Sequence, residues 1–165
     1  MKKIIVGFSY SNSLFSKLIK IFTSSKISHT YIRLPVPEYN TSVVFQASLL
    51  SVHYVTADVF KSHSTIVEEY ELEVSDEQFS VGEKFRVTEV GKPYSYTQIL
   101  GFLYVLMLRK FGKKVSNPLS NGDHAYVCVE VVANSIGVSN GESMTPEELR
   151  LWCKDNARLV YKKSI

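Results

Sequence analysis

The 165-residue sequence predicts an α+β fold. Segments rich in β-branched and aromatic residues dominate residues 1–74, helical patterns follow from residue 75, and one more strand candidate closes the chain. No repeat or Pro/Gly-rich linker divides the sequence, so we expect one domain that spans residues 1–165. Hydrophobic residues make up 45% and charged residues 21%, as is typical of a globular protein with a buried core.

The first half is expected to contain five strands and one helix. Apolar residues recur at helical spacing within residues 11–25, while Lys17 and Lys20 lie on the other side of that helix. The prolines within 35–40 predict a loop. The expected strands are residues 2–8, 27–34, 41–48, 51–55 and 64–74.

The second half is expected to be mainly helical. Thr145, Pro146 and Glu148 together form a strong helix start, with a cap, a first-turn proline and a capping box. Gly82 weakens the middle of one predicted helix. The predicted helices are residues 75–91, 96–112, 128–136 and 145–156, followed by a strand at 157–161.

Charge and apolar patterning limit the possible partners. The excess of Lys and Arg over Asp and Glu is 19 − 16 = 3, and the lysines form no continuous stripe, so we expect no nucleic-acid partner. The most apolar stretch, residues 99–108, would span about 15 Å as a helix, half of a bilayer core. We therefore expect this stretch to form a buried helix. Contact with a membrane is the less favoured interpretation.

The cysteines and the N-terminal segment indicate the compartment. Cys128 and Cys153 are too few for a disulfide framework, and the first apolar run is too short for a signal peptide. We expect a cytoplasmic protein. Its oligomeric state is not determined by the sequence.

The candidate chemistry narrows to a cysteine and a histidine. His29, His53, His63 and His124 show none of the close spacings that bind metals, and no Gly-rich phosphate loop occurs, so we expect neither metal nor cofactor. Cys128 starts a predicted helix, whose N-terminus favours a thiolate. From the residues alone, the favoured interpretations are a small buried hydrophobe for Cys128 and a capping or surface residue for His29.

The order of five short motifs resembles a known family. They are "SHTYIRL", "VVFQAS", "KPYSYTQILG", "AYVCVEVVANSIG" and "TPEELRLW". This order is similar to that of circularly permuted NlpC-type papain-like proteins, a branch that includes YiiX/YaeF-like bacterial proteins and is related to lecithin-retinol acyltransferases. The resemblance implies a permuted papain-like fold, with a small antiparallel sheet packed against helices and a cysteine helix facing a histidine strand.

The resemblance also implies roles for individual residues. Cys128 would be the nucleophile, His29 its base, and Gln46 would hold the imidazole where the family has a carboxylate. Val129 replaces a small serine of the family. The backbone N–H of Cys128 would be one oxyanion donor, and the candidates for a second donor are Tyr10 and Tyr126.

The implied activity is that of a thiol-dependent hydrolase, a cysteine peptidase or amidase that acts on a peptide or isopeptide amide without a cofactor. Two alternatives stay open. One is an acyltransferase or lipid esterase of the same fold, with residues 99–108 lining an acyl channel and an acyl-containing substrate. The other is a non-catalytic binding module.

Overall fold

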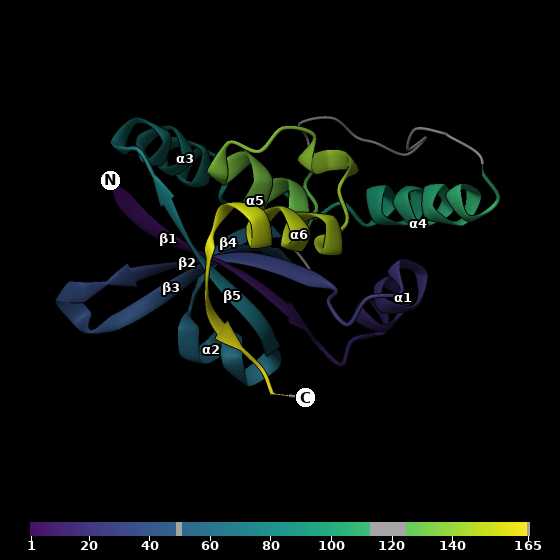
Figure 1. The fold of residues 1–165 in the computed structure, drawn as a ribbon, viewed down its shortest axis with the longest axis horizontal. Helices are drawn as coiled ribbons and strands as arrows, with labels where there is room; N and C mark the ends of the chain where they lie inside the picture. The colour runs from purple at the N-terminus through teal and green to yellow at the C-terminus, as the bar shows by residue number, and fades with distance from the viewer. Residues whose placement is uncertain (49–50, 113–124, 165) are drawn as a thin grey trace.

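A computed structural model of the chain describes residues 1–48, 51–112 and 125–164. The described strands form one six-stranded antiparallel sheet in the order β4-β3-β2-β1-β5-β6 (Figure 1). Sheet and helices together confirm the α+β class. The strands are β1 (Lys2–Tyr10), β2 (His29–Val36), β3 (Thr41–Ser48), β4 (Ser51–Thr56), β5 (Thr65–Val74) and β6 (Arg158–Lys162).

Helices cover both faces of this sheet. Helices α5 and α6 lie over one face, and α2 lies on the opposite side (Figure 1). Within the described residues, none of the helices is both long and apolar enough to cross a bilayer. The helices are α1 (Leu14–Thr23), α2 (Ala57–His63), α3 (Asp76–Glu89), α4 (Tyr96–Lys110), α5 (Cys128–Ile136) and α6 (Pro146–Asn156), with short 3₁₀ segments η1 (Pro37–Tyr39) and η3 (Gly141–Ser143).

The central helix α5 sets the position of the cysteine. Every residue of α5 except Asn134 is buried, and the helix packs on the apolar residues of β1, β2 and β3. On the side of α5 that faces away from the sheet, Gly82 allows α3 to approach α5 closely, because a Cβ atom at this position would lie 2.2 Å from the carbonyl oxygen of Ser135. The glycine that weakens the predicted α3 is therefore explained by tight helix packing.

Two details of the expected secondary structure are wrong. The sequence analysis assigns no helix to residues 57–63, where α2 begins after the cap residue Thr56 and buries Phe60. Seven residues are too few to show a helical period clearly. Pro35 continues β2 instead of starting the loop. The pairing of β2 with β1 extends only to Arg33, so Pro35 has lost one neighbouring strand and its missing N–H costs no ladder bond there.

Candidate active site

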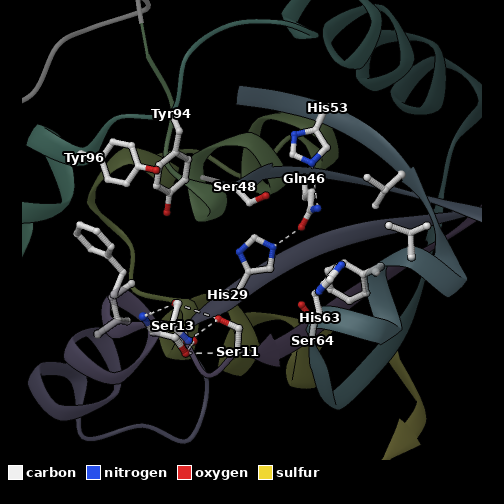
Figure 2. A pocket seen from close by; sticks show the side chains of 17 residues that line it. Ser11, Ser13, His29, Gln46, Ser48, His53, His63, Ser64, Tyr94 and Tyr96 are labelled. Carbon is white, nitrogen blue, oxygen red and sulfur yellow. Dashed lines mark hydrogen bonds between the residues drawn. The ribbon is translucent and has the colours of Figure 1, made fainter. Parts of the chain in front are cut away.

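A cavity of about 370 Å³ opens beside the first residue of β2. His29, Gln46 and His53 line one side of it, and Tyr94 and Tyr96 lie across from them (Figure 2). This volume falls within the roughly 300–1,000 Å³ that is usual for ligand pockets. The cavity is therefore large enough to hold a substrate fragment.

Three side chains of the cavity form a hydrogen-bonded chain. Gln46 Oε1 lies 2.8 Å from His29 Nε2, and Gln46 Nε2 lies 3.2 Å from His53 Nε2 (Figure 2). His53 Nδ1 in turn lies 2.8 Å from the carbonyl oxygen of Ser51. Gln46 and His53 face each other across the β3–β4 pair, and Gln46 is only 7% exposed. The pairing of neighbouring strands thus fixes the positions of the three hydrogen-bonded side chains.

The donors and acceptors in this series of hydrogen bonds follow from its last member, the carbonyl oxygen of Ser51. A carbonyl oxygen only accepts, so His53 Nδ1 donates to Ser51, and the Nε2 atom of the same ring is left to accept from the amide nitrogen of Gln46. The Gln46 amide group donates to that nitrogen, which turns its carbonyl oxygen toward His29. His29 Nε2 then donates to Gln46, and the Nδ1 atom of His29 keeps its lone pair. The chain therefore selects the tautomer of His29 that a general base needs.

The surroundings also keep His29 neutral. Burial lowers the pKa of His29 to about 4, although the bond to Gln46 raises it and the proximity of His53, which disfavours a second positive charge, lowers it further. At neutral pH the ring is therefore uncharged and able to accept a proton. This environment suits a base better than one half of an ion pair.

Cys128 is the first residue of α5 and is only 4% exposed. Backbone N–H groups of Thr30, Val129 and Cys128 itself lower the pKa of the thiol, but burial is the larger effect and raises it. The helix N-terminus therefore favours the thiolate, as expected, but it is not the larger effect. Desolvation of the sulfur outweighs the stabilisation from the helix end.

The thiol faces a second, smaller chamber of about 40 Å³. Ile99 and Leu103 line this chamber, as the acyl-channel alternative expects, together with Val129 and Met144. A water molecule needs roughly 10–15 Å³ of such accessible volume, so the chamber has room for a few water-sized groups and not for an acyl chain. The apolar lining explains why burial raises the pKa of the thiol.

The residue that follows His29 on β2 lies at the thiol of Cys128. Ser28 lines the small chamber together with Cys128, and the N–H of Thr30 acts on the sulfur. Tyr94 lines both chambers, and its hydroxyl is a hydrogen-bond partner of the thiol. The structure thus joins His29 to Gln46 directly, whereas Cys128 lines the smaller chamber and not the cavity of His29.

Two members of the site are absent from the sequence prediction. His53 was weighed there only as a metal ligand, and Tyr94 was not singled out. A signal for His53 was present, because a two-residue connection between residues 48 and 51 pairs position 46 with position 53. Nothing in the sequence places Tyr94 beside the thiol.

Of the other residues that the sequence singles out, His63 lines the larger cavity, whereas the two tyrosines lie elsewhere. Tyr10 lines a groove beside α1, with Lys20 Nζ 4.5 Å from its ring centre, and Tyr126 packs against Phe85. Neither tyrosine lines a chamber with Cys128, so neither is placed as an oxyanion donor. His124 lies outside the described residues.

Comparisons with known proteins identify the fold. No family model matches the chain, and no curated protein matches it either. Among solved structures, yiiX from Escherichia coli O157:H7, described as a metalloprotein, superposes with a TM-score of 0.62. The two chains share 18% identity over 99% of this chain and 97% of that chain. The chain therefore has a YiiX-like fold, which matches the YiiX part of the resemblance.

We expect alkylation to distinguish the two cysteines. Cys128 lines a chamber, whereas Cys153 is 0% exposed and burial raises its pKa to about 12. Iodoacetamide should therefore label Cys128 first, and the rate should rise with pH because the thiol is protonated at rest. Peptide mass spectrometry of wild type and of Cys153→Ala measures this. Labelling as fast at pH 5 as at pH 8 would contradict the protonated thiol.

Proposed function

We propose that the chain is a thiol-dependent hydrolase that cleaves peptide or isopeptide amides, with Cys128 as nucleophile and His29 as base. The observation that supports this most is the hydrogen-bonded chain from Ser51 through His53 and Gln46 to His29. That hydrogen-bonded chain leaves a basic nitrogen on His29, which directly precedes Thr30, a hydrogen-bond partner of the thiol. We also keep the cytoplasmic location as a prediction.

In the proposed reaction, His29 Nδ1 takes the thiol proton as the sulfur of Cys128 attacks the substrate carbonyl carbon. The C–S bond forms and the carbonyl π electrons move to oxygen. When the tetrahedral intermediate collapses, the C–N bond breaks and His29 gives the proton to the leaving amine. Water then attacks the thioester, His29 accepts the proton of the water, and Cys128 leaves and is protonated again.

The oxyanion of the intermediate needs donors near the thiol. The backbone N–H of Cys128 at the start of α5 is one, as the resemblance implies. We propose the hydroxyl of Tyr94 as the second, because it already hydrogen-bonds the thiol and faces both chambers. Burial and the nearby thiol keep the pKa of Tyr94 well above its usual value, so its proton remains available for donation.

The two chambers favour an amide substrate over a lipid ester. The larger cavity of about 370 Å³ has serine, histidine, glutamine and tyrosine side chains that can bind the polar groups of a peptide. The chamber at the thiol, about 40 Å³, accepts a small group only. An acyltransferase, a lipid esterase and a binding module stay as alternatives that the experiments below separate.

The neighbour yiiX is described as a metalloprotein, and a metal site requires several His, Cys, Asp or Glu side chains close together. In the described ranges, no group of three or more His, Cys, Asp or Glu side chains is placed to hold a metal ion. His29 and His53 both use Nε2 to hydrogen-bond Gln46, so these two nitrogen atoms are engaged in hydrogen bonds and not in metal binding. We therefore do not extend the neighbour's metal to this chain.

Trapping of an acyl-enzyme tests the nucleophile and the bond together. Wild-type protein incubated with peptide, isopeptide and acyl-ester probes should gain the acyl mass on Cys128 from the amide probes, and Cys128→Ala should gain none. The melting temperature of Cys128→Ala should stay within a few degrees, since the lost sulfur costs on the order of 1 kcal/mol. An adduct only with ester probes would favour the lipid alternative, and no adduct with any probe would favour the binding module.

Variants of Gln46 test the orienting role through the pH profile. Gln46→Ala should lower turnover by about 10- to 100-fold, because the imidazole is free to rotate. Gln46→Glu should keep the activity and raise the pKa of His29 by adding a negative charge. Since the base must be neutral, activity is lost as the pH falls through the pKa of His29, near 4 in the wild type.

The expected result is an acidic limb that moves to higher pH in Gln46→Glu and to lower pH in Gln46→Ala, which loses the bond that raises the pKa. Ser48→Ala is the matched control, since Ser48 lines the same cavity on the same strand. Identical limbs in wild type and both Gln46 variants would remove Gln46 from the site.

A further inference from the structure

Helix α1 exposes two large apolar side chains at the surface. Among its ten residues only Ser16 is buried, and Leu14 and Ile21 are 71% and 68% exposed. Leu14 and Ile21 are seven positions apart and therefore share one face of the helix. An amphipathic helix normally turns such residues toward the core, so this face lacks a partner within the described chain.

Helix α4 continues the exposed apolar surface. It contacts α1, and the two helices lie together at one end of the molecule (Figure 1). Four large apolar residues spaced by four, three and four positions form a second exposed row, which runs along the helix and just past its C-terminus: Leu100, Tyr104, Met107 and Phe111. Single exposed apolar residues are ordinary, but two rows on neighbouring helices are typical of an interaction surface.

A basic groove of about 790 Å³ borders the same face of α1. Its lining includes Ile21 and contains no carboxylate residue. Four lysines line it from three separate segments: Lys17, Lys20, Lys26 and Lys163. Apolar and cationic side chains are therefore adjacent on one surface, a combination suited to lipid acyl chains beside anionic headgroups.

We propose that α1, the exposed row of α4 and this lysine groove form a docking surface for an anionic phospholipid membrane. Leu14 and Ile21 would enter the headgroup boundary, and the lysines would face lipid phosphates. Charge favours a membrane over a second copy of the chain, since a two-fold contact through this face would oppose lysine to lysine. The proposal does not depend on the proposed hydrolase activity.

Co-sedimentation with vesicles tests the proposal on the full chain. The probes are vesicles of phosphatidylcholine alone and of phosphatidylcholine with phosphatidylglycerol at 3:1, at low and high salt. We expect at least about tenfold more protein bound to the anionic vesicles at low salt, and a loss of that binding at high salt. Cys128→Ala should bind as the wild type does, which separates docking from catalysis.

Paired variants test the two components of the surface. Leu14→Asn with Ile21→Asn removes the apolar component, and Lys17→Gln with Lys20→Gln removes part of the charge; each pair should reduce binding several-fold. The matched controls are Val87→Asn, which is 68% exposed on the distant α3, and Lys84→Gln on the same helix. Both controls should bind as the wild type does. Circular dichroism checks that all variants are folded.

Three results would overturn the proposal. One is equal binding to neutral and anionic vesicles, and another is binding that survives both α1 variant pairs. The third is an absence of vesicle binding together with a dimer in analytical ultracentrifugation that the Leu14 and Ile21 pair dissociates. That third result would assign the surface to a second copy of the chain.

Discussion

The carbonyl oxygen of Ser51 accepts a hydrogen bond from His53 Nδ1 at 2.8 Å, and this bond determines the direction of the hydrogen bonds from His53 through Gln46 to His29. Because a carbonyl cannot donate, the ring of His53, the amide of Gln46 and the ring of His29 each have one compatible orientation. The register of β3 and β4 supplies the rigid frame, since it sets Gln46 opposite His53. A backbone atom at a strand end thus selects the tautomer of a histidine two side chains away.

This arrangement accounts for a site built from neutral groups. Burial disfavours charge on both Cys128 and His29, raising the pKa of the thiol and lowering that of the imidazole. A carboxylate in place of Gln46 would stabilise an imidazolium but would itself need to be buried as a charge, which is costly without full pairing. A glutamine orients the ring without that cost. In our proposal the charge therefore develops only during the reaction.

Much of the frame could be predicted from the sequence, because it depends on local patterns. The capping box of Thr145 with Glu148 and the strand pattern around His29 indicate elements that the structure contains. Helix α2 was missed because it is short. The surface position of α1 could not be foreseen either, since an amphipathic pattern predicts burial of its apolar face and gives no sign of what covers it.

The site was predicted less completely for physical reasons. His29 and Gln46 were named from the resemblance, and their hydrogen bond is present. The protonation state of Cys128 depends on the balance between helix N–H groups and burial, which requires the packing around the sulfur to be known. Tyr94 reaches the thiol from a segment that is distant in sequence from α5, and residue patterns do not encode such a contact.

The most direct test of this account is the protonation state of His29 in the intact protein, measured by ¹⁵N-edited NMR of the imidazoles, with His29→Gln identifying the resonances. The account predicts a neutral ring with its proton on Nε2 at pH 6 to 7, and protonation only as the pH falls toward about 4. A proton on Nδ1 at neutral pH, or titration at the ordinary histidine pKa near 6.5, would contradict it.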